Sequence, residues 1–347
     1  MTLPAHAESQ RVAIYFVASP LQYLAARRIA EHFEQGARQI IVYYKHGVAP
    51  IVRAEEWDAA AYMPWPRFEP LHGPFGRLRR LRKNLHDVAD LVGSAHEIHL
   101  HSAVFDTEAI NYFVRGLPRL TGATILKARI LPDGIISIRR YPLSALKRIG
   151  QCLRKLRRLV APELEYSCFS GDRIGSDATF VDRIYIQPSI PHQYSLAKVV
   201  MLPPLVERDA AMTATTSRAL VIGQPLSGAG LMSPAQSEQT GREIEAWLKT
   251  QGATEVHYKA HPKDPNRELF RPDYQLLELN EPLESYMARN AYAYIIGVRS
   301  TVLFLARELY GPDARILAFG LERVRFKSQG EKQDMLELME QLNIEMQ

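Results

Sequence analysis

Short apolar runs of strand length recur along this chain, and several are followed by segments with helical spacing. The run "RVAIYFVA" ends at Ser19-Pro20, and the apolar residues of the following "LQYLAARRIAEHF" recur at helical intervals. Further strands are expected at 38–44, 97–102, 124–134 and 182–187. Continuous apolar strands that alternate with helices are typical of a parallel sheet buried on both faces. We therefore expect the first half of the chain to be of the α/β class.

The pattern is interrupted near residues 203–217 and then resumes. The segment "PPLVERDAAMTATTS" lacks apolar periodicity and has the composition of a linker. Beyond it, "RALVIGQPL", "EVHYKAHP" and "YAYIIGVRS" have the form of strands, while "SEQTGREIEAWLKTQG" and "STVLFLARELYG" have the form of helices. A chain of 347 residues with 46% hydrophobic content accommodates two domains. We predict Rossmann-like domains over 1–205 and 206–347 that face each other across a cleft, as in the GT-B architecture.

Cysteine usage and the N-terminal segment limit the class of protein. Cys152 and Cys168 stand alone, without a CxxC or CxxH cluster, so a disulfide framework and a structural zinc site are not expected. The first ten residues lack a basic n-region, and the apolar run after them is too short for a signal peptide or a membrane span. We expect a cytoplasmic, soluble protein, and peripheral contact with a membrane stays open.

Asp133 is the first candidate for chemistry. It lies in "ARILPDGIIS", where Pro132-Asp133-Gly134 ends an apolar run, so its carboxylate is expected at the carboxyl end of a strand, on the ligand side of the sheet. Pro-Asp-Gly is also favoured turn chemistry. Both interpretations stay open on the residues alone.

The segment "YKAHPKD" supplies the second candidate. It places His261-Pro262 at a strand end, with Lys259 and Lys263 on either side. On the residues alone, the pair either only ends the strand, with solvated lysines beside it, or has a functional role. Ser300 and Thr301 follow "YAYIIG" and open a helix. They are expected either to cap it or to form an anion site with its free amides. Together these residues predict a phosphate pocket in the second domain.

In their order along the chain, these motifs resemble the bacterial sialyltransferases of GT-B fold, in particular the lipooligosaccharide sialyltransferases and capsular polysialyltransferases. The motifs that resemble those of this family are "VASPLQYLAARRIAEH", Asp133-Gly134, "VIGQPL", "YKAHP" and the pair Ser300-Thr301 preceded by a glutamate. The resemblance covers residues 11 to about 305.

The resemblance implies a role for each matching residue. Asp133 would be the general base for the acceptor hydroxyl, and His261 would contact the donor phosphate and act as general acid. Ser19 and Gln22 would bind the acceptor. Glu284 would hold the ribose hydroxyls of the cytidine, with Glu281 as the alternative. The donor-nucleotide set is Gly223, Lys259, His261, Pro262, Glu284, Ser300 and Thr301.

The implied reaction transfers a nonulosonic acid from a CMP-sugar to a glycan or lipid-linked glycan, with inversion and without a cofactor or metal. Charge that develops on the leaving phosphate can be met by His261, Lys259 and a helix N-terminus. One residue departs from the family motif, because Pro132 stands where a supporting carboxylate is usual. Two alternatives stay open, a GT-B-like sugar-nucleotide epimerase and a non-catalytic subunit of a polysaccharide assembly complex.

Two basic stretches complete the pattern, "GRLRRLRK" at 76–83 and "LSALKRIGQCLRKLRRLV" at 143–160. The second repeats its leucines at helical spacing and contains no acidic residue, so it predicts an amphipathic basic helix. Three roles stay open for this helix. It is a solvated surface helix, it rests on an anionic membrane leaflet, or it lines a groove that binds an acidic polysaccharide. Nucleic acid is not expected as a partner, since few aromatic residues interleave with the charge.

Overall fold

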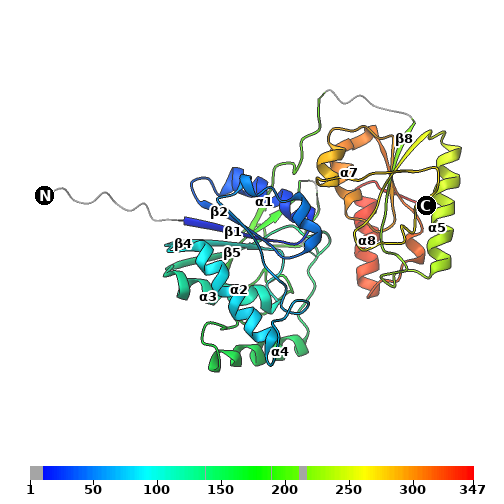
Figure 1. The fold of residues 1–347 in the computed structure, drawn as a ribbon. Helices are drawn as coiled ribbons and strands as arrows, with labels where there is room; N and C mark the ends of the chain where they lie inside the picture. The colour runs from blue at the N-terminus through cyan, green and yellow to red at the C-terminus, as the bar shows by residue number, and fades with distance from the viewer. Residues whose placement is uncertain (1–10, 137, 189, 211–216) are drawn as a thin grey trace. The chain divides into compact units, whose positions relative to one another are not determined.

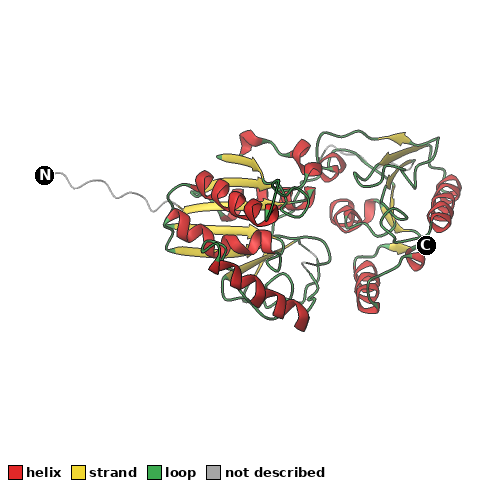
Figure 2. Cartoon of the chain, turned by 60° about the horizontal axis from the view of Figure 1, so that its bottom comes forward, coloured by secondary structure: helices red, strands yellow, loops and turns green. Residues whose placement is uncertain are grey.

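The computed structural model describes residues 11–136, 138–188, 190–210 and 217–347. It divides into two compact units, each with its own sheet. Unit 1 comprises the chain up to residue 188 together with 192–205, and unit 2 comprises 206–347 with the short segment 189–191. Figures 1 and 2 show a sheet and its covering helices in each unit.

Unit 1 is built on a seven-stranded parallel sheet in the order β3-β2-β1-β4-β5-β6-β7. Its strands are β1 (Arg11–Val17), β2 (Arg38–Tyr43), β3 (Ala59–Tyr62), β4 (Glu97–Ser102), β5 (Ile125–Ile130), β6 (Val181–Ile186) and β7 (Val199–Met201). Its helices are α1 (Pro20–Phe33), α2 (Gly76–Val92), α3 (Glu108–Thr121) and α4 (Ala145–Lys155), with 3-10 turns η1 (His46–Ile51), η2 (Ala54–Glu56) and η3 (Leu156–Leu159).

Helices cover both faces of this sheet, with α1 on one face and the neighbouring α2 and α3 on the other (Figure 1). The central strand β1 is therefore buried on both sides, and residues 12–17 have no exposed surface. Because neither face of such a strand contacts water, its residues need not alternate between apolar and polar, and this explains its continuous apolar run.

Unit 2 has a six-stranded parallel sheet in the order β10-β9-β8-β11-β12-β13. The strands are β8 (Arg218–Ile222), β9 (Glu255–Lys259), β10 (Gln275–Leu276), β11 (Tyr294–Gly297), β12 (Arg315–Ala318) and β13 (Glu345–Met346). The helices are α5 (Pro234–Thr250), α6 (Leu283–Met287), α7 (Val302–Tyr310) and α8 (Gln329–Gln341), with η4 (Gly311–Asp313) and η5 (Leu321–Arg323). In Figure 1, α5 lies on one side of β8 and α7 and α8 on the other.

Both sheets change direction beside their first strand. In unit 1 the chain moves outward from β1 to β3 and then continues from β4 on the other side of β1; in unit 2 the same change occurs at β8 and β11. Ligands of open α/β sheets bind outside the carboxyl ends of the strands at such a change of direction. The loops after β1, β4, β5, β8, β9 and β11 therefore lie on the expected ligand side of the two sheets.

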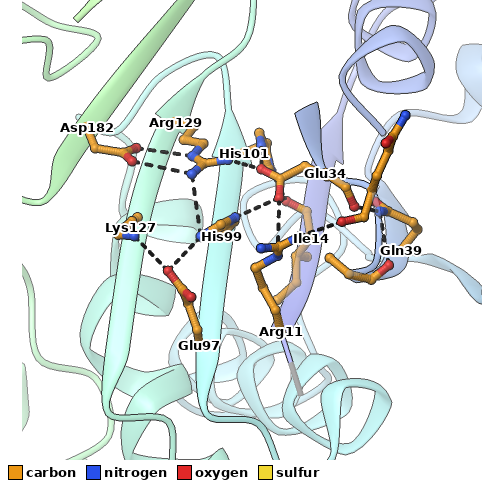
Figure 3. A network of polar contacts seen from close by, with 12 residues as sticks. Arg11, Ile14, Glu34, Gln39, Glu97, His99, His101, Lys127, Arg129 and Asp182 are labelled. Carbon is orange, nitrogen blue, oxygen red and sulfur yellow. Dashed lines mark hydrogen bonds and ion pairs between the residues drawn. The ribbon is translucent and has the colours of Figure 1, made fainter. Parts of the chain in front are cut away.

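The core of unit 1 contains a buried ionic network (Figure 3). Glu34 is fully buried at the end of α1 and pairs with Arg129 of β5, which is 2% exposed and also bonds Asp182 at 3.2 Å. His99 Nδ1 lies 2.7 Å from Glu34 Oε2, and His101 Nε2 lies 3.2 Å from Glu34 Oε1. Because ions without partners are costly to bury, this network requires each member to keep its partner.

Candidate functional site

Asp133 lies in the loop that follows β5 of unit 1. Its neighbour Gly134 has φ +57°, which is the left-handed region that glycine adopts without steric cost, so a turn forms here as Pro-Asp-Gly predicts. The Asp133 side chain is half-buried. Burial raises its pKa, while a hydrogen bond with Gln22 and the charge of Lys45 act in the opposite direction. A carboxylate with a raised pKa is a stronger base than one in water.

Gln22 orients this carboxylate from the start of α1. It is 2% exposed, and its Oε1 accepts a hydrogen bond of 2.7 Å from the Ala18 amide. Because the amide oxygen is engaged there, the amide nitrogen is the group that donates to Asp133. Ser19 caps the same helix, with its Oγ accepting from the Gln22 amide at 3.3 Å. Both side chains predicted to bind the acceptor thus make contacts that build the Asp133 site.

Two further residues at this edge of the sheet were not predicted. Tyr44 follows β2, and its pKa is raised by burial and then by the charge of Asp133. The Tyr44 ring stacks on Trp65 with 4.5 Å between ring centroids. Lys45, exposed and next along the chain, lowers the pKa of Asp133. The sequence signal for both was their position at the end of the strand "RQIIVYY", at the same sheet edge as Asp133.

In unit 2, hydrogen bonds join the loops that follow β8, β9 and β11. The Gly223 amide donates to the Lys259 carbonyl at 2.9 Å. Gln224 Oε1 accepts from the amides of Val298 and Arg299 at 3.1 and 2.8 Å. The loops that carry Lys259, Ser300 and Gly223 therefore form one connected surface at the change of direction of the sheet.

Gly223 has a steric reason to be glycine. A Cβ at this position would lie 2.4 Å from Tyr258 Oη and 3.0 Å from the Lys259 carbonyl oxygen. The absence of a side chain lets the first loop approach the second closely. Gln224, which the sequence prediction omitted from the site, makes the link to the third loop.

His261 is exposed at the start of the loop that follows β9, and the exposed Pro262 comes next. Its Nδ1 accepts a hydrogen bond of 3.0 Å from the Lys263 amide, so Nε2 carries the proton of the neutral ring and is the group that donates. Partial desolvation and the charge of Lys263 lower the His261 pKa, against the opposing charge of Asp264. The half-buried Lys259 also has a lowered pKa, because burial disfavours its charge.

Ser300 and Thr301 lie at the start of α7, as predicted. Ser300 Oγ accepts from the Val302 amide at 3.3 Å, which is a local cap interaction. Thr301 occupies the cap position itself without a side-chain cap hydrogen bond, and it is exposed. The first amides of α7 point along the helix axis, where its dipole favours an anion.

Glu284 and Glu281 differ sharply in their surroundings. Glu281 forms two hydrogen bonds with Arg289, at 2.6 and 2.7 Å. Glu284 lies on α6 and is 6% exposed, and within the described part of the chain its Oε2 has no hydrogen-bond partner. Burial raises its pKa. A buried carboxyl oxygen without a partner is rare, and a hydrogen-bond donor of a ligand would satisfy it.

The predicted site residues therefore form two sets. Ser19, Gln22 and Asp133 gather in unit 1, and Gly223, Lys259, His261, Pro262, Glu284, Ser300 and Thr301 belong to unit 2. Over the described ranges, no three His, Cys, Asp or Glu side chains come together as ligands for a metal ion.

The second unit and the end of the first resemble a known protein family. Residues 186–317 match the family model Alpha-2,8-polysialyltransferase (POLYST). The resemblance predicted from the sequence motifs is thereby confirmed, and the matched segment contains Gly223, Lys259, His261, Glu284 and Ser300. No curated protein matches the sequence significantly.

The structure is similar to several solved structures at low sequence identity. The α/β-galactoside α-2,3-sialyltransferase of the luminous marine bacterium Photobacterium phosphoreum is 10% identical with a TM-score of 0.54, and the match covers 98% of this chain and 99% of that one. UGT89C1 of Arabidopsis thaliana, complexed with UDP-L-rhamnose, is 11% identical with a TM-score of 0.51 and coverages of 97% and 84%. The UDP-GlcNAc 2-epimerase of Neisseria meningitidis is 13% identical with a TM-score of 0.48 and coverages of 96% and 91%. The predicted fold class, GT-B with two parallel-sheet α/β domains, is confirmed.

The family match supports a glycosyltransferase, and the similar solved structures support the GT-B fold. In the part of the chain that the structure describes, no helix has both the length and the hydropathy of a membrane span.

Proposed function

We propose that this protein is an inverting, metal-independent glycosyltransferase that transfers sialic acid, or a related nonulosonic acid, from a CMP-sugar to a hydroxyl of a bacterial surface glycan. The glycan would be a lipooligosaccharide or a capsular polysaccharide. The observation that carries the proposal is the connected surface of unit 2, which displays Lys259, His261 and the start of α7 within the segment that matches the polysialyltransferase model.

In this proposal unit 2 stabilises the leaving CMP. As the bond between the anomeric carbon and the phosphate oxygen breaks, its electron pair stays on the phosphate, which gains negative charge. The His261 Nε2–H, the Lys259 ammonium and the first amides of α7 are donors suited to that charge. No metal ion is needed where cations and amides meet the charge of a monophosphate.

The protonation of His261 follows donor binding. In the free protein its lowered pKa favours the neutral ring. An adjacent phosphate favours the charged form of a histidine and so raises its pKa. Donor binding would therefore protonate His261, and the proton would then be available to the departing phosphate.

Glu284 suits the ribose of the nucleotide. Its carboxylate is buried and its Oε2 has no partner in the described ranges, so hydroxyl donors from a ribose would satisfy it. Glu281 is engaged by Arg289, which makes it the weaker choice.

Asp133 is the proposed base. It would take the proton of the acceptor hydroxyl while the acceptor oxygen bonds to the anomeric carbon from the side opposite the phosphate, and this geometry inverts the anomeric configuration. Its raised pKa increases its basicity, and Gln22 fixes its orientation. Pro132 supplies no second carboxylate, so the basicity of Asp133 would depend on burial.

Calorimetric titration with CMP and with cytidine tests the donor site. Wild-type protein should bind CMP more tightly than cytidine, and in His261→Ala that advantage should shrink by about tenfold or more, since a charged hydrogen bond contributes about 1.5–3 kcal/mol. His72→Ala, which alters an exposed histidine of unit 1, is the control. An undiminished advantage of CMP in His261→Ala would remove His261 from the phosphate site.

A further inference from the structure

The basic segment 143–160 packs on unit 1 with its polar side inward. It forms α4 and the adjoining turn η3, and the buried residue of α4 is Gln151, which is 2% exposed. Gln151 Oε1 accepts a hydrogen bond of 3.0 Å from the Phe169 amide. The side of the helix that contains this glutamine is therefore the side that contacts the protein.

The opposite side of the helix is apolar and exposed. Ile149 and Leu153, two positions before and after Gln151, are roughly 160° away from it around an ideal helix. The exposed large apolar residues of the segment, which we call the outward face, are Leu146 (81% exposed), Ile149 (58%), Leu153 (62%), Leu156 (56%), Leu159 (77%) and Val160 (76%). An amphipathic helix that packed on its own domain would bury this side, so the observed arrangement is inverted.

Exposure on this scale requires a partner. Single exposed leucines are ordinary on protein surfaces, but a contiguous apolar patch marks an interaction site. The six residues of the outward face come from one continuous segment of 15 residues, 146–160. By contrast, the buried leucines of α2 and α3 face the core of unit 1.

Basic side chains lie on the flanks of the helix, between the outward face and the side that contacts unit 1. Three of the arginines form ion pairs with acidic residues of unit 1: Arg154 and Arg157 with Glu108, and Arg158 with Glu165. These pairs fix the helix to the domain. Within the described residues Arg148 and Lys155 form no ion pair, and both are exposed.

A second basic segment lies beside this helix. Arg77, at the start of α2, pairs with Glu108, which Arg157 also contacts. The N-terminal turns of α2, where "GRLRRLRK" begins, therefore adjoin the end of the α4–η3 segment. The exposed Phe75 (80%) immediately precedes α2. Apolar and cationic groups thus occur together on this side of unit 1.

We propose that the outward face lies in the interfacial region of an anionic lipid membrane, with α4 parallel to the membrane plane. Such a helix places its apolar side chains at the boundary between headgroups and acyl chains, and its Lys and Arg side chains meet the anionic headgroups. This proposal does not depend on the proposed catalytic function.

The charge pattern favours this partner over two others. An acidic polysaccharide would satisfy the cations but would leave six apolar side chains in water. A second copy of the chain would bury the apolar side chains but would bring two basic borders together, and like charges in close contact repel. An anionic membrane satisfies both features at once.

Sedimentation with vesicles tests the proposal on the full-length chain. Wild-type protein should bind vesicles of phosphatidylcholine and phosphatidylglycerol much more tightly than vesicles of phosphatidylcholine alone. The variant Leu146→Gln/Leu153→Gln/Leu156→Gln should lose at least about 100-fold in partition constant, since each leucine loses apolar burial. Leu120→Gln/Leu196→Gln, which alters exposed leucines elsewhere in unit 1, should bind as wild type does.

The charged border is tested separately. Arg148→Gln/Lys155→Gln should reduce binding to the anionic vesicles about 30-fold, because each cation near such a surface contributes about 1 kcal/mol. These two side chains form no described ion pair, so thermal unfolding of the variant should match that of wild type. Arg242→Gln/Lys249→Gln removes the same charge from the exposed side of α5 in unit 2 and should leave binding unchanged.

Insertion is distinguished from adsorption by a fluorescence reporter. The emission of Leu153→Trp should shift to shorter wavelength when anionic vesicles are added, because its side chain would enter the lipid.

Three results would overturn the proposal. The first is wild-type binding that does not depend on anionic lipid. The second is a triple leucine variant that binds vesicles normally but has lost self-association, which would assign the face to a second copy. The third is normal vesicle binding by that variant together with weaker binding of an acidic polysaccharide.

Discussion

Asp133 owes its proposed role to a few neighbouring side chains. Burial raises its pKa, and Gln22, held by the Ala18 amide, directs a donor at the carboxylate. The sequence identified Asp133 through its motif, and the positions of Ser19 and Gln22 after the first strand were also apparent. The contributions of Tyr44 and Lys45 were not, since they depend on which strand ends lie next to each other in space.

Replacing Asp133 with asparagine tests the base directly. Asp133→Asn keeps the size of the side chain but removes the proton acceptor, so kcat for transfer should fall by about 100-fold or more. CMP affinity should stay near the wild-type value, because the proposed donor residues all belong to unit 2. Steady-state kinetics and calorimetry measure the two quantities, with the exposed Asp87→Asn of α2 as the control. Full activity in Asp133→Asn would exclude it as the base.

Glu284 and Glu281 provide a matched pair of variants. Glu284→Gln should weaken CMP binding by roughly 10- to 100-fold, as expected when a charged hydrogen-bond acceptor is lost. Wild-type protein should discriminate against 2′-deoxy-CMP, and Glu284→Gln should lose that discrimination. Glu284 is buried and its Oε2 has no partner in the described ranges, so Glu284→Gln breaks no hydrogen bond at that oxygen. The melting temperature of this variant should therefore not fall below that of wild type. If Glu281→Gln had the larger effect on binding, the ribose contact would belong to Glu281.

At the scale of elements, burial explains what the sequence could predict. Central strands such as β1 and β8 are covered on both faces and read as continuous apolar runs. The strands that were missed are short: β3 and β12 have four residues, β7 has three, and β10 and β13 have two. The expected helix at 143–160 is confirmed over Ala145–Lys155, but its apolar side faces outward, which periodicity cannot reveal.

The ionic network of unit 1 also could not be predicted from the sequence. Glu34 lies at the end of a helix, where a glutamate is ordinarily exposed, and Arg129 lies in a strand that was expected from its apolar residues. Only the packing of α1 beside β4 and β5 brings these side chains together with His99 (Figure 3).

Strand β5 offers a test of this network with an internal control. Arg129→Met leaves the buried Glu34 without its main cationic partner and should lower the free energy of unfolding by about 3–5 kcal/mol. Lys127→Met, two residues earlier, removes a half-exposed pair with Glu97 and should cost at most about 1 kcal/mol. Urea unfolding measures both variants. Equal effects would mean that the network adds nothing beyond a surface ion pair.

At the scale of the whole molecule, the two units should respond differently to acid. Burial lowers the pKa of His99 and lowers that of His101 to about 3, so both stay neutral in folded unit 1 at pH values where the unfolded chain binds protons. Stability should therefore fall as the pH drops below about 6.5, by up to about 1.4 kcal/mol per histidine and pH unit. In unit 2, burial raises the pKa of Glu308 to about 7 and raises that of Glu284, and such carboxyls favour the folded state as the pH falls.

Tryptophan fluorescence can follow each unit. Trp57 and Trp65 belong to unit 1, and Trp247 belongs to unit 2. The fluorescence of Trp247→Phe therefore reports on unit 1, and that of Trp57→Phe/Trp65→Phe reports on unit 2. Between pH 7 and pH 5 the urea midpoint of unit 1 should fall more than that of unit 2. The raised pKa of Asp133 opposes this loss of stability in unit 1, and the lowered pKa of His261 gives unit 2 some acid sensitivity, but each is one group against the two histidines of unit 1. A larger fall in unit 2 would contradict this assignment.

Release of CMP from a set of CMP-activated nonulosonic acids is the most direct measurement of the central claim. The wild-type protein should release CMP from at least one of them, slowly by hydrolysis without acceptor and faster with a glycan acceptor, and it should do so in the presence of a metal chelator. His261→Ala should release none above background. CMP binding without turnover of any donor would contradict the claim, and so would turnover of a UDP-sugar in place of the CMP-sugars.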